Sequence, residues 1–234
     1  MSPFVPGPVF TTFSIVGRCA RTGMLGIGIA TRSMAVGARC VYARASVGAV
    51  ASQASTDPRL GLLGLRLLEM GYSAPKVLAE LVSSDPHIAK RQLGIVDKDG
   101  HAVAYTGAEN REWCGHQVGE NYAAIANMVA NDRVVPAMVE AFTRTQDEPL
   151  EERLLKAIEA GHAAGGQAEG EHSAALYVVD REVFARVDLR VDEHPEAVAE
   201  LRRIFELYKP LITYFAARPA NPYLPSPEAW MQRQ

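Results

Sequence analysis

The chain has few cysteines, little net charge and no long hydrophobic run, and each shortage excludes a class of protein. The three cysteines among 234 residues are odd in number and widely spaced, which argues against a disulfide framework and favours a reducing compartment. No apolar stretch reaches the length of a membrane span. A formal net charge of −3 without basic blocks gives no electrostatic footprint for nucleic acid. We therefore expect a cytoplasmic protein with neither a membrane nor a nucleic-acid partner.

Motifs for metals and cofactors are also scarce. The six histidines never pair with one another at ligand spacing, and no Cys-x-x-Cys occurs. The pair Gly26 and Gly28 lacks the third glycine and the βαβ setting of a dinucleotide fingerprint. The run 73–76 matches Ser-x-x-Lys, but its context indicates the start of a helix. The sequence gives no support for a metal site and implies no cofactor.

What is present is ordinary globular composition, with 48% hydrophobic and 22% charged residues, enough for one sizeable core. Residues 1–10 hold three prolines and a glycine and predict an extended arm. Residues 11–208 predict one domain. Residues 209–234 form a proline-rich tail, which we expect to lie on the surface or to reach a partner.

Strand-like and helix-like patterns occur in alternating groups. Strands are predicted over 11–19, 24–31, 40–45, 46–53, 91–96, 102–106, 122–129, 173–179 and 184–191. Helices are predicted over 58–70, 73–83, 132–146, 148–163 and 195–208, with Asp57 and Ser73 as N-caps of the first two. Grouping of this kind favours an α+β fold, and near-continuous apolar strands favour sheets buried on both faces. Two stacked sheets between two helical layers satisfy both observations.

The first strand begins with two hydroxyl residues, Thr11 and Thr12. A threonine at the head of a buried strand becomes a nucleophile if its own α-amino group is freed, because that amine can accept the hydroxyl proton. Ten residues precede Thr11, so such a role would require cleavage of the chain. The alternative is a β-branched residue at a strand start, which needs no chemistry.

Several motifs together resemble the DUF1028 family, whose members are similar to the N-terminal nucleophile (Ntn) hydrolases. The motifs are Thr12-Phe13-Ser14-Ile15-Val16, the runs 29–37 and 48–54, Ala163-Ala164-Gly165-Gly166, Ser173-Ala174-Ala175-Leu176 and the run 187–195. The resemblance covers about residues 11 to 208. It implies a four-layer αββα sandwich of the proteasome-subunit type, in which the nucleophile heads the first strand and backbone amides stabilise the oxyanion.

The resemblance implies that Thr12 corresponds to the threonine that commonly follows the initiator methionine in this family. In this sequence Ser2 follows Met1 instead. Proteasome-like sites also carry a lysine on the third strand, and this chain has none before Lys76. The nearby cations are arginines, which stay protonated and cannot act as a base. After Gly165-Gly166, where relatives more often show an acid and a base, this chain has Gln167 and Glu169.

Six residues form the predicted site. Thr12 is the predicted nucleophile, with Ser33 placed to orient a substrate; a turn serine is the alternative for Ser33. Arg32 and Arg39 are predicted to bind an anionic group of the substrate, or else to be solvated charges. Gln53 and Asn127, polar residues in apolar strands, are predicted to contact the substrate, or else to bridge the sheets.

These observations predict an Ntn-type hydrolase acting on a C–N amide bond of a small or peptide-like substrate. The alternative is a binding or assembly module that kept the fold and lost the chemistry, for which the residues before Thr12 and the missing lysine both argue. Ntn-type folds often associate through their helical layers, so we also expect a homo-oligomer, most simply a homodimer.

Overall fold

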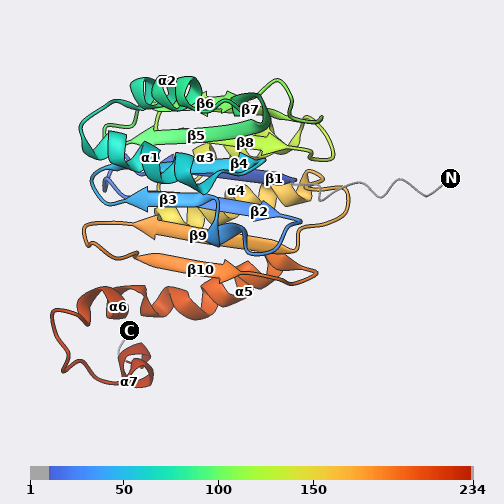
Figure 1. Ribbon diagram of the computed structural model, residues 1–234. Helices are drawn as coiled ribbons and strands as arrows, with labels where there is room; N and C mark the ends of the chain where they lie inside the picture. Colours follow the sequence, from blue (N-terminus) through green and yellow to red (C-terminus); the bar gives the residue numbers. More distant parts are fainter. Residues whose placement is uncertain (1–10, 233–234) are drawn as a thin grey trace.

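Two antiparallel sheets are stacked between two layers of helices (Figure 1). The computed structural model describes residues 11–232. The arm predicted for residues 1–10 lies outside the described residues, as do the last two residues of the predicted tail. The four-layer α+β architecture expected from the grouping of strands and helices is confirmed.

The larger sheet has six strands in the order β10-β9-β2-β1-β8-β7. Its strands are β1 (Thr12–Arg18), β2 (Leu25–Thr31), β7 (Gly115–Gly119), β8 (Tyr122–Asn127), β9 (Ser173–Val179) and β10 (Val187–Val191). The central strand β1 pairs with β2 on one side and with β8 on the other, which places Thr12 opposite both Thr31 and Asn127. The side chains of residues 14–17 are apolar or small, and they are buried on whichever face of the sheet they occupy, as predicted.

The smaller sheet has four strands in the order β3-β4-β5-β6. They are β3 (Val41–Arg44), β4 (Gly48–Ala54), β5 (Arg91–Asp97) and β6 (Ala102–Thr106). The predicted hairpin turn between β5 and β6 is present, with Gly100 at a φ of 92° that favours glycine. Apolar side chains of both sheets form a central core, to which Val16, Ile27 and Val96 belong.

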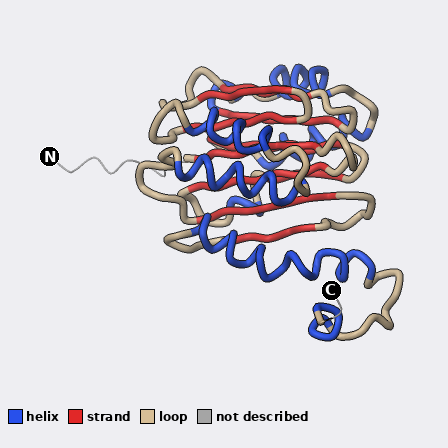
Figure 2. Tube along the Cα trace, turned by 180° about the vertical axis from the view of Figure 1, so that it is seen from behind, coloured by secondary structure: helices blue, strands red, loops and turns tan. Residues whose placement is uncertain are grey.

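Helices α1 (Pro58–Glu69) and α2 (Ala74–Ser84) cover the smaller sheet. Helices α3 (Val134–Arg144), α4 (Leu150–Ala163) and α5 (Ala197–Tyr208) cover the larger one, and Figure 2 shows the helices of one outer layer lying across the strands. Short 3₁₀ helices occupy Val36–Ala38 (η1), Ile88–Lys90 (η2) and Lys209–Leu211 (η3). Each outer layer therefore has its own apolar core against one sheet.

The two predicted helix caps have different outcomes. Asp57 caps α1 as predicted, because its carboxylate accepts a hydrogen bond of 3.0 Å from the backbone N–H of Arg59. Ser73 occupies the N-cap position of α2 but makes no capping hydrogen bond with its side chain. Asp97, at the end of β5, instead accepts the N–H of Ala74 at 3.0 Å. A carboxylate distant in sequence thus replaces the local cap.

The sequence patterns missed β7 and the helices of the tail. β7 is a short edge strand whose central residues 116–118 are exposed, so it lacks the apolar alternation that predicts a strand. The tail contains α6 (Ile212–Ala217) and α7 (Pro227–Met231), which lie beyond the β10 edge of the sandwich (Figure 1). Tyr214 of α6 is fully buried and packs edge-on against Trp230 of α7. Among residues 11–232, no helix has the length and apolar character needed to cross a membrane.

Candidate active site

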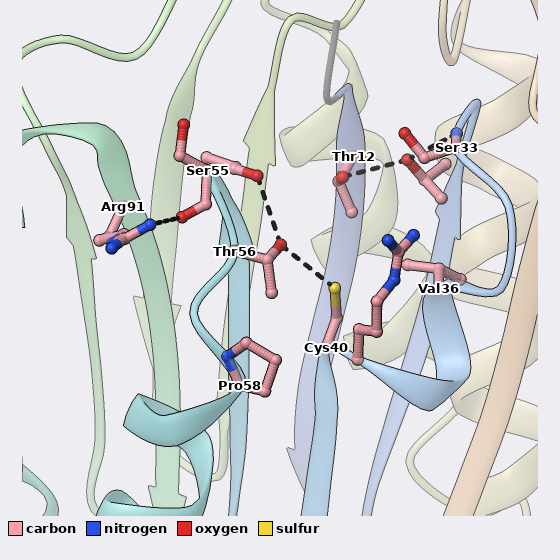
Figure 3. A pocket seen from close by; sticks show the side chains of 11 residues that line it. Thr12, Ser33, Val36, Cys40, Ser55, Thr56, Pro58 and Arg91 are labelled. Atoms are coloured by element: carbon pink, nitrogen blue, oxygen red, sulfur yellow. Dashed lines mark hydrogen bonds between the residues drawn. The ribbon is translucent and has the colours of Figure 1, made fainter. Parts of the chain in front are cut away.

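A pocket of about 230 Å³ opens where β1 begins and β2 and β4 end (Figure 3). The start of α1 and the turn around η1 complete its wall. Three of the six predicted site residues line it, together with side chains that the sequence did not single out. The lining residues are Thr12, Thr31, Ser33, Val36, Arg39, Cys40, Ala54, Ser55, Thr56, Pro58 and Arg91.

Thr12 is the first residue of β1 and only 4% exposed. Its Oγ1 lies 3.2 Å from the Oγ1 of Thr31, the cross-strand neighbour on β2. The Thr31 hydroxyl donates its own proton to the carbonyl oxygen of Thr11, so in the contact between the two hydroxyls Thr12 is the donor. Thr31 therefore connects the Thr12 hydroxyl with the peptide carbonyl that precedes Thr12.

Ser33 lies at the rim of the same pocket, just after β2. Its backbone N–H points to Thr31 Oγ1 at 3.4 Å, and its carbonyl accepts the hydroxyl of Ser173 at 2.5 Å. These contacts use the main chain of Ser33, and no side-chain hydrogen bond of Ser33 is present among the described residues. Its half-buried hydroxyl remains available to a molecule in the pocket.

Gln53 and Asn127 lie beneath Thr12 rather than along the pocket wall, at 0% and 1% exposure. Gln53 Nε2 donates to the carbonyl of Thr12 at 3.3 Å and to Gln92 Oε1 at 2.8 Å, and Asn127 Nδ2 donates to the same Gln92 oxygen at 2.9 Å. Ser14 donates to Gln53 Oε1 at 2.5 Å. This buried amide network joins β1 and β8 of the larger sheet to β4 and β5 of the smaller sheet, and it fixes the backbone of Thr12.

The two predicted cationic residues take different positions. Arg39 lines the pocket, is exposed, and donates to the backbone carbonyl of Met34 at 2.5 Å. Arg32 points to a neighbouring pocket of about 660 Å³ and forms an ion pair with Glu169, although both side chains are largely exposed. Within the part of the chain that the structure describes, Arg39, and not Arg32, is therefore the cation of the Thr12 pocket that forms no ion pair.

The loop after Gly165-Gly166 reaches the residue before Thr12. Both glycines have positive φ angles, of 125° and 45°, which turn the chain back after α4. Gln167 accepts a hydrogen bond from the Thr11 hydroxyl, and its own N–H is held by Glu171 at 2.8 Å. Glu171 is 3% exposed and also contacts His162 Nδ1 at 2.7 Å. The loop thus orients Thr11 through a neutral amide.

Cys40 and Arg91 were missed as pocket residues. Cys40 lies directly before β3, close to the place where the family resemblance leads one to expect a lysine, and its Sγ is 3.5 Å from Thr56 Oγ1. Burial raises the pKa of the Cys40 thiol, so it stays protonated near neutral pH. Arg91 is committed to Asp85 at 2.8 Å and to Asp57 at 3.7 Å. Neither group can act as a base for Thr12.

Among the pocket residues that were not predicted, Thr31 is the one whose position beside Thr12 the sequence itself indicates. It ends a predicted strand, and the hairpin between β1 and β2 places it directly opposite Thr12. Counting that register back from the predicted turn at 20–23 identifies the pairing from sequence alone. Cys40 carried no such signal, because its position depends on how the two sheets stack.

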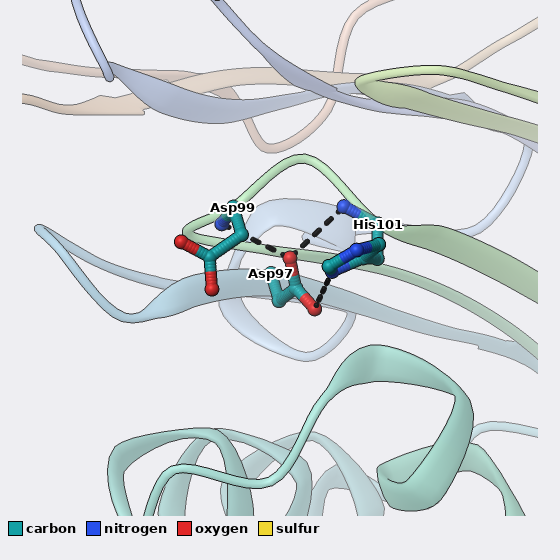
Figure 4. Close-up of side chains that lie close together, drawn as sticks. All are labelled: Asp97, Asp99 and His101. Atoms are coloured by element: carbon teal, nitrogen blue, oxygen red, sulfur yellow. Dashed lines mark hydrogen bonds and ion pairs between the residues drawn. The ribbon is translucent and has the colours of Figure 1, made fainter.

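A second cluster lies in the turn between β5 and β6, where ligand atoms of Asp97, Asp99 and His101 fall within 4.8 Å of one another (Figure 4). Asp97 Oδ1 accepts the backbone N–H groups of Asp99 and His101 at 3.0 and 2.9 Å, while its other oxygen accepts that of Ala74. These bonds use the Asp97 carboxylate to close the turn and to cap α2. The geometry is explained by turn and cap chemistry without an ion.

Comparison with known proteins places the chain in a family. Residues 12–201 match the model described as a family of unknown function, DUF1028. The fold is similar to the crystal structure of a DUF1028 protein from Silicibacter pomeroyi, with 32% identity, a TM-score of 0.79, and coverage of 85% of this chain and 89% of that one. Anbu, an ancestral beta-subunit from Yersinia bercovieri, is similar over 92% of this chain and 98% of its own, at 12% identity and a TM-score of 0.42. No functionally curated protein matches the chain. The chain belongs to the DUF1028 family.

Proposed function

We propose that the protein is an Ntn-type hydrolase that cleaves a C–N amide bond with Thr12 as its nucleophile. The observation that carries this proposal is the position of the Thr31 hydroxyl between the Thr12 hydroxyl and the carbonyl of the peptide bond that precedes Thr12. Its hydroxyl is 3.2 Å from that of Thr12 and donates to the carbonyl oxygen of Thr11. At the edge of the pocket, the nucleophile thus lies next to a hydroxyl that donates to the carbonyl the nucleophile would attack.

The first amide cleaved would be the one that precedes Thr12. Thr12 Oγ1 attacks the carbonyl carbon of Thr11, and the hydroxyl proton passes to the departing nitrogen as the C–N bond breaks. An ester then joins the Thr11 acyl group to Thr12 Oγ1, and the α-amine of Thr12 is free. Water hydrolyses the ester and releases the residues before Thr12. The Thr31 hydroxyl stabilises the negative charge that develops on the Thr11 oxygen in the first step.

The freed α-amine supplies the base that the pocket otherwise lacks. It belongs to the nucleophile itself and would accept the Thr12 hydroxyl proton when a substrate amide is attacked. Arg39 offers an exposed guanidinium to a substrate carboxylate, and the half-buried Ser33 hydroxyl can orient the substrate. A pocket of about 230 Å³ favours a small acyl group over a bulky one.

A second candidate function is a binding module without catalysis. The observation that favours it is the absence, among the described pocket residues, of a lysine, histidine or carboxylate that could take a proton before the chain is cleaved. Cys40, with its raised pKa, does not replace such a group. If the residues before Thr12 stay attached, the pocket can bind a ligand but has no base.

The test uses a chain in which Thr12 directly follows the initiator methionine, so that removal of the methionine exposes its amine. This protein is treated with a β-lactone, which acylates N-terminal threonine hydroxyls, and the adduct is located by peptide mass spectrometry. We expect one adduct on Thr12, none in Thr12→Ala, and hydrolysis of members of an N-acyl amino acid panel. Absence of both adduct and hydrolysis, with a bound ligand still detected in the pocket, would support the binding module instead.

A further inference from the structure

A pocket of about 420 Å³ lies at the end of β1 opposite to Thr12. β1 runs from Thr12 to Arg18, so the two ends are separated by about 20 Å of extended chain. The turn between β1 and β2, the turn between β7 and β8, and the connection from α3 to α4 converge there. Arg18, Arg21 and Arg153 all line it, and we call it the arginine pocket.

Arg153 is the buried member of this group, with 6% of its surface exposed. Its guanidinium donates to the backbone carbonyl of Phe142, at 3.2 and 3.4 Å, stacks 4.0 Å from the centre of the Phe142 ring, and lies beside the Cys19 thiol. No carboxylate lies within 4.0 Å of it among the described residues. A buried cation without a counter-charge is costly, so its surroundings call for an anion.

The other two arginines are also unpaired with acids. Arg18 donates to Asn121 Oδ1 at 2.9 Å, and its Nε is buried without a hydrogen-bond partner among residues 11–232. Arg21 is exposed and donates to the backbone carbonyls of Gln146 and Glu148 at 3.1 and 3.2 Å. Three arginines therefore line one cavity, and none of them forms an ion pair with an acid among residues 11–232.

Arginines elsewhere in the molecule behave differently. The side chains of Arg91, Arg186 and Arg202 are 13, 20 and 23% exposed, and each lies beside a carboxylate, with closest N–O distances of 2.8, 3.3 and 2.7 Å. The acids that do line the arginine pocket, Glu120 and Asp147, are exposed, and neither forms an ion pair with its arginines. These shielded arginines thus each have a carboxylate partner, which Arg153 lacks among residues 11–232.

The Cys19 thiol is a buried group of the pocket that could itself become a counter-charge. Burial opposes its ionisation, but hydrogen bonds at Thr22 and the charge of Arg153 outweigh burial and lower its pKa. A single thiolate would still leave Arg18 and Arg21 without an acid. The volume of the pocket also exceeds what a thiolate occupies and falls in the range of small-molecule sites.

We propose that the arginine pocket binds a small molecule through an oxyanion group, a phosphate or a carboxylate, held by Arg18, Arg21 and Arg153. Guanidinium groups match such oxyanions in shape and bind them through paired hydrogen bonds. The site is separate from the Thr12 pocket, so it neither requires nor implies the hydrolase activity proposed above.

The test is calorimetric titration of the full chain with inorganic phosphate, pyrophosphate and citrate at constant ionic strength, with sodium chloride as the reference. We expect at least one of the three to bind saturably below about 1 mM, and the phosphate and citrate arms tell the two oxyanions apart. Arg21→Gln, at an exposed position that preserves the fold, should weaken binding about tenfold, the effect of one charge-assisted contact. Arg18→Gln should weaken it at least as much.

The matched control is Arg66→Gln, an exposed arginine on α1 that should leave binding unchanged. Cys19→Ser should also retain binding, because the arginines and not the thiol hold the ligand. The proposal is overturned if none of the three anions binds, or if Arg21→Gln and Arg18→Gln bind as the unaltered chain does. Loss of binding in Cys19→Ser alone would equally contradict it.

Discussion

The two ends of β1 are built from different kinds of polar group. Around Thr12 the buried groups are mainly hydroxyls and amides that hydrogen-bond with one another and with the backbone, although Asn127 Oδ1 and Gln167 Nε2 have no partner among the described residues. Around Arg18 the polar groups are guanidinium cations that find backbone carbonyls and an amide but no acid within 4.0 Å among the described residues. One strand of seven residues thus joins a region built mainly of buried neutral amides and hydroxyls to one built of cations without an acid.

The difference follows from the cost of burying each kind of group. A neutral hydroxyl or amide can be buried once its hydrogen bonds are made inside the protein, and the result is a rigid and well-defined geometry. A cation needs an anion as well. The buried amide network at the Thr12 end therefore needs no counter-ion and is suited to position a nucleophile, whereas the Arg18 end offers cations to the oxyanion ligand proposed above.

The largest effect is expected from removing the donor to the Thr11 carbonyl. Thr31→Val keeps the shape of the side chain but removes the hydroxyl, and we expect release of the residues before Thr12 to slow by at least about 100-fold. A time course of intact mass measures this rate. Thr56→Val is the matched control, because Thr56 lines the pocket yet contacts Cys40 instead of Thr11. Equal rates in Thr31→Val and the control would remove Thr31 from the mechanism.

The amide network beneath Thr12 should be a major contributor to stability. The Gln92→Leu substitution removes the oxygen that accepts hydrogen bonds from both Gln53 and Asn127. Each buried N–H group left without an acceptor lowers the free energy of unfolding by about 1–3 kcal/mol. We therefore expect the free energy of unfolding to fall by roughly 2 to 4 kcal/mol in urea denaturation. Gln117→Leu, at an exposed position of β7, should change it by less than about 0.5 kcal/mol. Similar losses in both variants would show that the network is not satisfied as described.

The cap of α1 next to the Thr12 pocket should make stability depend on pH. Hydrogen bonds from Arg59, with the charges of Arg59 and Arg91, lower the pKa of Asp57 to about 2. In the unfolded chain the Asp57 carboxyl has a pKa of about 3.9. Its contribution to the stability of the folded protein is therefore fully present above that value and is lost as the pH falls toward the folded-state pKa. Asp57→Ala should cost about 1–2 kcal/mol at pH 7.

The measurement is urea denaturation of Asp57→Ala and the unaltered chain between pH 7 and pH 2. The gap between the two should close as the pH falls from about 4 to 2, since protonated Asp57 loses its charged contacts with arginine. Asp99→Ala, at an exposed turn position, serves as the control and should differ little from the unaltered chain at any pH. A gap that stays constant with pH would show that the charge of Asp57 contributes nothing.

The smallest effect is expected when the Arg18 end is altered and the Thr12 end is observed. Arg21→Gln removes one cation about 20 Å from the nucleophile, and we expect release of the residues before Thr12 to change by less than about twofold. The same intact-mass time course measures it, in buffer without phosphate or citrate. A tenfold change would show that the two ends of β1 are coupled and that the comparison between them needs revision.

The sequence predicted the layers of the fold well because those layers depend on local pattern. Apolar strands such as β2 and amphipathic helices such as α4 are readable from spacing alone. β7 was missed because its side chains are polar and exposed, and its pairing with β8 depends on a partner strand. Ser73 holds the predicted N-cap position of α2 without a side-chain capping bond, because the carboxylate that accepts the Ala74 N–H comes from Asp97, 24 residues after Ser73.

The site was predictable only in part. Thr12 and Ser33 follow from strand ends, which the sequence places well, and both line one pocket. Arg32 and Arg39 look equivalent in sequence, yet only the fold directs one to the Thr12 pocket and the other to Glu169. The arginine pocket was not predicted at all, because three separate connections bring Arg18, Arg21 and Arg153 together. Convergence of distant loops leaves no pattern in a single sequence.

The most direct test of the Thr12 chemistry is the intact mass of the purified full-length protein, followed over time beside a Thr12→Ala variant. We expect the unaltered chain to lose the residues before Thr12, so that its mass becomes that of a protein beginning at Thr12. The Thr12→Ala variant should keep its full mass under the same conditions. If both proteins keep their full mass after prolonged incubation, Thr12 does not cleave its own chain, and the contact of Thr31 with the Thr11 carbonyl is structural.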